Sequence, residues 1–164
     1  MRLRQFYLYF FIDLIWDLRL GIHTVFSDYR GMNRTNYGYD PTPYQVLQKL
    51  VKSGWLRKED TLVDYGCGKG RVGFFLSYRT KSKTIGIEYD DRIYKSALEN
   101  RKTTISRRKP DFVLTRAEEY ALPPEVDRCY FFNPFSVEIL HKVMARIIES
   151  YSESPRDIFL FFYY

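Results

Sequence analysis

The chain has 164 residues, of which 45% are apolar, and its formal net charge is +6. This length and apolar content are typical of one globular domain with a core, and they exclude an intrinsically disordered chain. The two cysteines, Cys67 and Cys129, argue against a disulfide framework and indicate reduced thiols, so we expect a cytoplasmic protein. The basic balance allows an acidic partner, either a nucleic acid or a membrane surface.

An apolar helix is predicted near the N-terminus, over residues 3–20. Its apolar middle is too short to span a bilayer, and Asp13 and Asp17 lie one turn apart on one face. No small-residue cleavage site follows, which argues against a signal peptide. We favour a helix that packs on the domain or in an oligomer interface. The alternative is a helix that lies in a membrane surface, with Arg2 and Arg4 near the head groups and Trp16 at the boundary.

A loop follows this helix and leads into a second helix that starts near residue 43. Thr42 is expected to be the N-cap of the second helix, with Pro43 in its first turn and Gly54 at its end. We therefore divide the chain into an N-terminal helix and loop, residues 1–42, and a ligand-binding domain, residues 43–164.

Beyond residue 60, short apolar runs alternate with helical patterns. Strands are expected up to residue 64 and over 84–88, 112–114, 126–132 and 158–164, and helices over 70–79, 92–107 and 136–150. Such alternation predicts an α/β fold with a parallel sheet and right-handed crossovers.

Three glycines at alternate positions, Gly66, Gly68 and Gly70, follow the first strand, which ends in Asp64. Because they lack Cβ atoms, backbone N–H groups in this turn can approach a ligand closely. The helix that starts directly after the turn adds partial positive charge at the same place. An acid at the end of the strand suits a ligand that carries an ammonium group.

A second reading of the turn is the dinucleotide fingerprint, Gly68-x-Gly70-x-x-Gly73, with Glu88 as the acid further on. That fingerprint needs its first glycine directly after the strand, where Gly66 lies instead. We therefore rank a NAD enzyme behind the other interpretations.

Glu88 ends the next strand and is expected at the same edge of the sheet as Asp64, residues 116–118 and residues 133–135. A carboxylate there can accept hydrogen bonds from two adjacent hydroxyl groups, as on a ribose. The alternative for Glu88 is a surface acid beside a helix N-cap. Convergence of several polar groups at one edge is stronger support for a binding site than any single group.

The pattern through residues 61–135 resembles the class I S-adenosylmethionine (SAM) dependent methyltransferases. The resemblance implies a Rossmann-like fold with a mostly parallel, doubly wound sheet, and SAM as the cofactor. By this resemblance, the residues that contact SAM are Asp64, Gly66, Cys67, Gly68, Gly70, Glu88, Ala117 and Glu118. Asp64 would hold the amino group and Glu88 the ribose, and the last two residues would lie near the adenine. Arg116 stands where the family often has an acid.

The sequence Asn133-Pro134-Phe135 resembles a shortened form of the motif (Asp/Asn)-Pro-Pro-aromatic of amino-group methyltransferases, without the second proline. An amide oxygen and a backbone carbonyl can accept both hydrogens of an NH2 group and so orient its lone pair. The resemblance implies that these three residues are catalytic. A turn that only ends the fourth strand is an equally weighted alternative.

The segment Tyr39-Asp40-Pro41-Thr42-Pro43 is similar to a loop of small class I methyltransferases, a group that includes protein lysine methyltransferases. That resemblance implies that Tyr39 and Thr42 cover the methionine end of SAM. The alternative is a helix N-cap beside a packing tyrosine.

The class I fold usually adds two more strands after the fifth, and this sequence ends at the fifth. We expect either a truncated chain or a second subunit or partner that covers the apolar edge strand. No spacing of His, Cys and acidic residues indicates a metal site.

The sequence thus predicts a SAM-dependent methyltransferase that acts on a nitrogen atom. Protein lysine is the first expectation for the acceptor and a nucleic-acid base amine the second, although protein or small-molecule acceptors are ranked above nucleic acid as a class. The alternative is a non-catalytic SAM-binding module that acts through association with a partner or a membrane surface.

Overall fold

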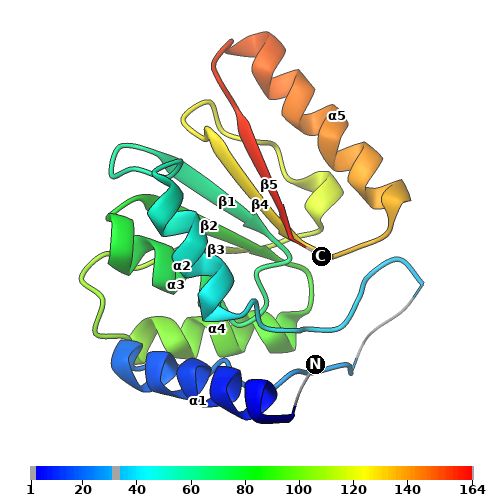
Figure 1. The fold of residues 1–164 in the computed structure, drawn as a ribbon. Coiled ribbons are helices and arrows are strands. Elements are labelled where there is room, and N and C mark those ends of the chain that lie inside the picture. Colours follow the sequence, from blue (N-terminus) through cyan, green and yellow to red (C-terminus); the bar gives the residue numbers. More distant parts are fainter. Residues whose placement is uncertain (1–2, 31–33, 164) are drawn as a thin grey trace.

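The computed structural model describes residues 3–30 and 34–163, and these residues form a five-stranded, all-parallel sheet in the order β3-β2-β1-β4-β5 (Figure 1). The strands are β1 (Thr61–Tyr65), β2 (Lys83–Glu88), β3 (Asp111–Leu114), β4 (Arg128–Phe132) and β5 (Phe159–Tyr163). The predicted α/β class and parallel sheet are confirmed. β4 begins at residue 128 instead of 126, and residue 164 of the predicted fifth strand lies outside the described part.

The helices are α1 (Leu3–Leu20), α2 (Tyr44–Ser53), α3 (Arg71–Thr80), α4 (Asp91–Thr103) and α5 (Val137–Glu153), with a short 3₁₀ helix, η1 (Ala117–Glu119). Successive residues of β1 point to opposite faces of the sheet, as in any strand. Leu62 packs in a cluster with α1, α2 and α3, whereas Val63 and Tyr65 pack with α5. The sheet is therefore covered on both faces, as a doubly wound fold requires.

The strand order reverses between β1 and β4, which are neighbours although β2 and β3 come between them in the chain. In open α/β sheets, the crevice beyond the carboxyl ends of the strands at such a reversal is the usual ligand site. The residues that follow β1 and β4 are the glycine turn and the Asn133-Pro134-Phe135 segment.

The helix predicted over 92–107 ends earlier, at Thr103. Thr104 Oγ1 and Ile105 N both donate hydrogen bonds to the carbonyl of Leu20, at 2.9 and 3.0 Å. A contact with the end of α1 thus replaces the hydrogen bonds that would have continued the helix.

Thr42 was predicted to be the N-cap of α2, and this was wrong. Pro43 is the N-cap residue, and the first N–H of the helix, that of Tyr44, donates a 3.2 Å hydrogen bond to Asp13 Oδ1 of α1. The carbonyl of Thr42 instead accepts a hydrogen bond from Arg71 Nη1 at 3.2 Å, and its hydroxyl lies 3.5 Å from the hydroxyl of Tyr130. Gly54 ends α2 in the left-handed conformation, as predicted.

The C-terminal half of α1 packs on the domain. Trp16 stacks on Tyr44 with ring centroids 5.9 Å apart and meets the edge of Phe75 at 4.9 Å, and Leu20 is fully buried. Arg2 and the side chain of Arg4, which the membrane interpretation placed near head groups, lie outside the described part. Within residues 3–30 and 34–163, no helix has the length and apolar content needed to cross a bilayer.

Candidate functional site

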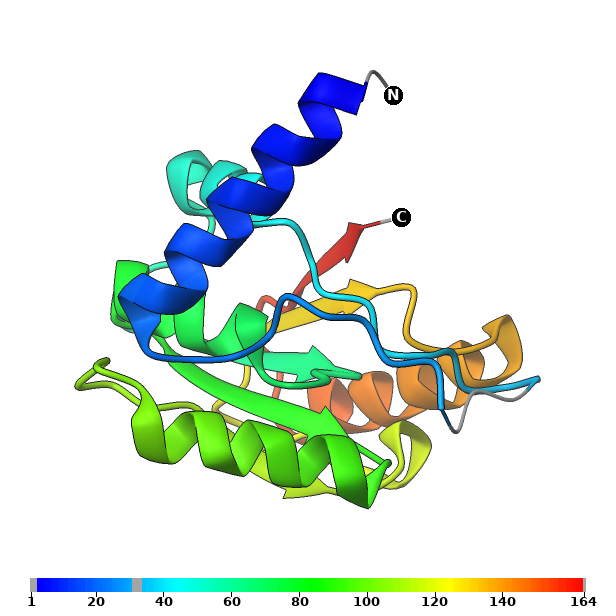
Figure 2. The same ribbon diagram turned by 90° about the horizontal axis from the view of Figure 1, so that it is seen from below.

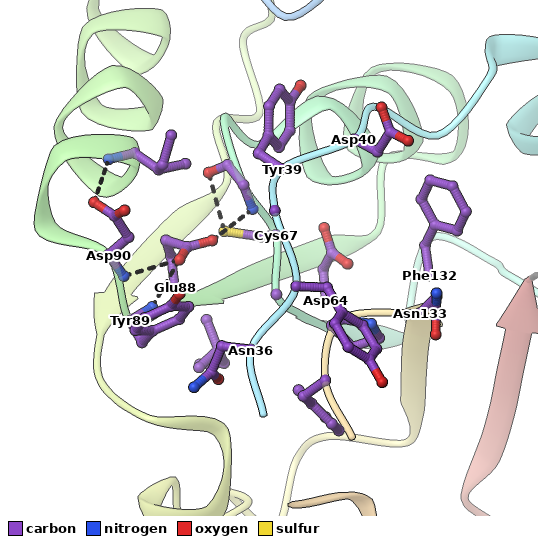
Figure 3. Close-up of a pocket in the computed structure, with 18 of the residues that line it drawn as sticks. Asn36, Tyr39, Asp40, Asp64, Cys67, Glu88, Tyr89, Asp90, Phe132 and Asn133 are labelled. Carbon is purple, nitrogen blue, oxygen red and sulfur yellow. Dashed lines mark hydrogen bonds between the residues drawn. The ribbon is translucent and has the colours of Figure 1, made fainter. Parts of the chain in front are cut away.

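A cavity lies beyond the carboxyl ends of β1, β2 and β4, beneath the described residues between α1 and α2, 21–30 and 34–43, which we call the strap (Figure 3). The predicted site residues that line it are Tyr39, Thr42, Asp64, Gly66, Cys67, Gly68, Glu88, Ala117, Asn133, Pro134 and Phe135. The structure thus brings together residues from five separate stretches of the chain. Gly70 and Glu118 were predicted to contact the same ligand but do not line this cavity.

The glycine turn depends on backbone conformations that favour glycine. Gly66, Gly68 and Gly70 have φ values of +74°, +56° and +87°. The N–H groups of Gly66 and Cys67 both donate to the carbonyl of Ile87, at 3.0 and 2.9 Å, and so tie the turn to β2. A Cβ on Gly70 would lie 2.6 Å from the ring of Phe112, which shows that this glycine serves packing behind the turn.

Tyr39 of the strap covers the turn at Gly68. A Cβ on Gly68 would lie 2.0 Å from Tyr39 Cδ2, and the Tyr39 hydroxyl donates a 2.7 Å hydrogen bond to the carbonyl of Thr24. Lys69 Nζ lies 4.9 Å from the centre of the same ring and donates to the carbonyl of Phe26 at 2.7 Å. Gly68 and Lys69 of the glycine turn therefore both contact the strap at the Tyr39 ring, and Lys69 also binds the strap through the carbonyl of Phe26.

We expect Gly68→Ala to destabilise the protein more than Gly54→Ala does. Both glycines have positive φ, but a Cβ on Gly54 meets no atom within 4 Å, whereas on Gly68 it collides with Tyr39. Backbone strain alone costs about 1 kcal/mol at either position, and overpacking against the ring adds roughly 1–3 kcal/mol at Gly68. Chemical denaturation of both variants measures the difference. Equal losses of unfolding free energy would show that Tyr39 does not pack on the turn.

Asp64 is a buried carboxylate at the centre of the cavity. Asp64 is 3% exposed, and its Oδ2 receives no hydrogen bond from the described residues. Burial, and secondarily the nearby charge of Glu88, raise the pKa of Asp64 to about 8. Figure 3 shows Asp64 between Glu88 on one side and Phe132 and Asn133 on the other. A buried carboxylate oxygen without a donor fits a ligand that brings a cationic N–H group.

The carboxylate of Glu88 accepts three backbone hydrogen bonds, one of them from the glycine turn. Its Oε2 accepts a hydrogen bond from Gly68 N at 3.0 Å, and its Oε1 accepts bonds from Tyr89 N and Asp90 N, both at 2.9 Å. Burial raises the pKa of Glu88, although these three hydrogen bonds act in the opposite direction. Glu88 thus fixes the glycine turn to the end of β2, a contact that sequence reasoning missed. A carboxylate has about four acceptor positions, so one remains for a ligand hydroxyl.

The segment after β4 brings Asn133 to the cavity in a left-handed conformation, with φ +38°. Asparagine tolerates this conformation better than most residues do. The carbonyl of Pro134 accepts a hydrogen bond from Tyr37 N of the strap at 3.3 Å. Phe135 packs edge-on against Phe131 in the core, with ring centroids 6.4 Å apart, and only part of it reaches the cavity.

Sequence reasoning missed Phe132, the last residue of β4, which lines the cavity beside Asn133 (Figure 3). It also missed the ion pair between Asp28 of the strap and Arg92 of α4. The salt bridges of Arg30 and Arg92 to Asp28 hold the pKa of this carboxyl far below its usual range. No local pattern signals contacts between residues so far apart in the chain.

At the predicted adenine side, Ala117 lines the cavity, while the carboxylate of Glu118 lies 3.9 Å from Arg116 Nη1. Thr115 also lines the cavity there. In the part of the chain that the structure describes, no group of three His, Cys, Asp or Glu side chains could hold a metal ion.

No model of a known protein family matches the chain. A protein-lysine N-methyltransferase of Saccharolobus islandicus is 31% identical over 64 residues, which are 38% of this chain and 39% of that protein. The match thus spans about two fifths of this curated relative.

Among solved structures, an RNA methyltransferase from Salinibacter ruber in complex with S-adenosyl-L-homocysteine aligns with a TM-score of 0.59 and 22% identity, covering 68% of this chain and 71% of that one. The magnesium protoporphyrin IX methyltransferase of Synechocystis PCC 6803 with bound SAM aligns with a TM-score of 0.52 and 20% identity, covering 71% and 55%. With its strand order and its glycine turn after β1, the chain therefore has the Rossmann-like fold of the class I SAM-dependent methyltransferases.

Proposed function

We propose that this chain is a SAM-dependent methyltransferase domain. The observation that carries the proposal is Asp64, whose buried Oδ2 receives no hydrogen bond from any residue that the structure describes, in a cavity bounded by the glycine turn. In this proposal Asp64 binds the ammonium group of SAM, and the remaining acceptor position of Glu88 binds a hydroxyl of its ribose. The backbone at Gly66 and Gly68 lies along the methionine part, and Ala117 lies beside the adenine.

When bound, SAM would supply an electrophilic methyl group: the lone pair of a neutral amine would attack the methyl carbon in line from about 3 Å, and the C–S bond would break with the sulfur leaving as a neutral thioether. The part of the chain proposed to hold the amine is the segment after β4. The side-chain oxygen of Asn133 and the carbonyl of Pro134 accept its two hydrogens, so that its lone pair points toward the methyl group. Phe132 provides an aromatic wall next to the amine.

A second hollow supports the acceptor side of this proposal. It shares Tyr37, Asn133, Pro134 and Phe135 with the main cavity and is otherwise lined by apolar residues of β4, α5 and β5. An apolar stem that carries the amine can lie there, next to Asn133. A lysine side chain has such a stem, and the curated relative is a protein-lysine N-methyltransferase. We therefore propose protein lysine as the first acceptor and a nucleic-acid base amine as the second.

The alternative function is a non-catalytic SAM-binding module, and one observation favours it. The carbonyl of Pro134, which the acceptor amine would need, already accepts a hydrogen bond from Tyr37 N. A carbonyl oxygen has two lone pairs, so this bond leaves one of them for the amine.

The test is transfer of a labelled methyl group from SAM to a lysine-containing protein, an RNA and a small amine, with wild type and Asn133→Ala. We expect wild type to label the lysine protein. Asn133→Ala should lower kcat roughly 10–100-fold through lost orientation of the amine, while SAM affinity by calorimetry stays within about twofold. SAM binding without transfer to any acceptor would favour the non-catalytic module. Absence of SAM binding by the folded chain would overturn both.

A further inference from the structure

The polarity of α1 is the reverse of that of an ordinary surface helix. Its acidic side chains face the domain, where Asp13 and Asp17 lie 2.6 and 3.8 Å from the guanidinium of the buried Arg71. Its outward side chains are apolar and range from 36% to 70% exposed: Tyr7, Leu8, Phe10, Phe11, Leu14, Ile15 and Leu18. A surface helix normally shows its charges to water and its apolar stripe to the core. The outward face of α1 is therefore suited to an apolar surrounding.

These seven side chains form one continuous face, which we call the outer face of α1. At about 100° per residue they fall within an arc of roughly 160° around the helix axis. Between Tyr7 and Leu20 no other residue falls within that arc, so the outer face contains no charge. Figure 2 shows the N-terminal half of α1 extending away from the rest of the molecule.

The width of the outer face favours a flat apolar partner. A helix that pairs with a second helix buries a narrow seam at two positions in seven, whereas an interfacial helix buries a wide arc in the boundary between head groups and acyl chains. Large contiguous apolar patches are rare on monomeric soluble proteins and usually mark an interaction site.

Basic side chains lie on one flank of α1. The guanidinium carbons of Arg19 and Arg79 lie 5.1 and 5.7 Å from the ring centre of Trp16, on the flank of α1. The chain as a whole has a net charge of +6. Basic side chains beside an apolar helix face are complementary to anionic lipid head groups.

We propose that α1 lies in the plane of an anionic membrane surface, with its outer face in the interface. Asp13 and Asp17 then stay on the protein side, paired with Arg71, and do not enter the lipid. The arrangement holds the domain on the membrane without spanning it, and it is independent of the proposed methyl transfer.

The experiment is co-sedimentation of the 164-residue chain with phosphatidylcholine vesicles, with and without phosphatidylglycerol. We expect binding to the anionic vesicles that weakens as salt is added. Phe11→Glu and Leu18→Glu should each lower the partition coefficient at least about tenfold. Ile148→Glu is the matched control, because Ile148 is 59% exposed on α5 and Phe11 is 57% exposed on α1. This control should bind like wild type.

All four proteins should show the same circular dichroism and unfolding midpoint, since the substituted side chains are exposed. Wild type that stays in the supernatant with both kinds of vesicle would overturn the proposal. Equal binding by Phe11→Glu and Ile148→Glu would also overturn it. Light scattering adds a third outcome: a wild-type dimer that Phe11→Glu converts to a monomer, without vesicle binding, would assign the outer face to a second copy of the chain.

Discussion

Asp64→Asn should abolish SAM binding, with affinity at least about 100-fold below that of wild type. In the proposed complex the buried carboxylate pairs with the ammonium group of SAM, and removing one partner of a buried charge pair costs about 3–5 kcal/mol. The asparagine side chain has the same shape, but its NH2 group is a hydrogen-bond donor. It would face the ammonium group of SAM, which is also a donor. Calorimetric titration of SAM into both proteins measures the effect. Asp91→Asn, an exposed acid at the start of α4, is the control and should bind like wild type.

The same substitution should stabilise the ligand-free protein at pH 8. The pKa of Asp64 is about 8 in the folded chain and 3.8 for an unperturbed carboxyl, so between these pH values the folded state retains a proton that the unfolded state has lost. Stability therefore falls as pH rises from about 4 to 8, by up to about 1.4 kcal/mol per pH unit, and the loss is complete above pH 8. Asn has no proton to lose, so this part of the pH dependence disappears.

Denaturation of both proteins at pH 5 and pH 8 tests the sign. The stability of Asp64→Asn relative to wild type should increase between the two values, while that of Asp91→Asn should not change. Identical pH dependence in wild type and Asp64→Asn would show that Asp64 is ionised in the folded protein. The cavity would then already stabilise a negative charge, and the argument for a cationic ligand group would fail.

The part of the fold that sequence could predict rests on local chemistry. Apolar runs followed by turn residues identify the strands, and the alternate glycines after Asp64 identify the turn at the carboxyl end of β1. The positive φ values of Gly66, Gly68 and Gly70 explain why glycine is needed there. Glu88 was predicted to end the second strand, and it is the last residue of β2.

Contacts between distant residues could not be predicted in the same way. Nothing near residue 104 signals that Leu20 will end α4, and Thr42 looked like an N-cap although its carbonyl binds Arg71. Sequence also named Phe135 as catalytic and missed Phe132; both residues line the cavity, and Phe132 lies beside Asn133 there. The direction of these rings depends on the left-handed backbone of Asn133, a conformation that the residue type permits but does not require.

The roles of the site residues in binding and catalysis stay predictions, as do the cytoplasmic location and association at the edge strand β5. β5 does lie at the edge of the described sheet, with Phe162 43% exposed. An apolar edge strand is a site for pairing with further polypeptide.

Arg71→Met should lower the free energy of unfolding by about 3–5 kcal/mol. Arg71 is 1% exposed and donates to Asp13 at 2.6 Å and to Thr24 Oγ1 at 2.7 Å, while its guanidinium lies 4.5 Å from the ring centre of Tyr44. Asp17 is 3% exposed and would keep its hydrogen bonds but lose its nearest cation. Methionine fills much of the volume, so the loss reports mainly on unpaired charge.

Two further variants separate charge from packing. Arg101→Met removes an exposed ion pair with Asp111 and should cost at most about 1 kcal/mol. Arg71→Met combined with Asp13→Asn should be less destabilised than the sum of the single variants, because the second change removes one of the carboxylates left without a cation. Strict additivity, or an Arg71→Met loss no larger than that of Arg101→Met, would contradict a buried ion-pair network. Arg71 is the first residue of α3, directly after the glycine turn, whereas Asp13 belongs to α1 and Thr24 to the strap. The network that stabilises the fold therefore also fixes the strap over the cavity. Arg71→Met should for this reason weaken SAM binding even under conditions where the variant is fully folded.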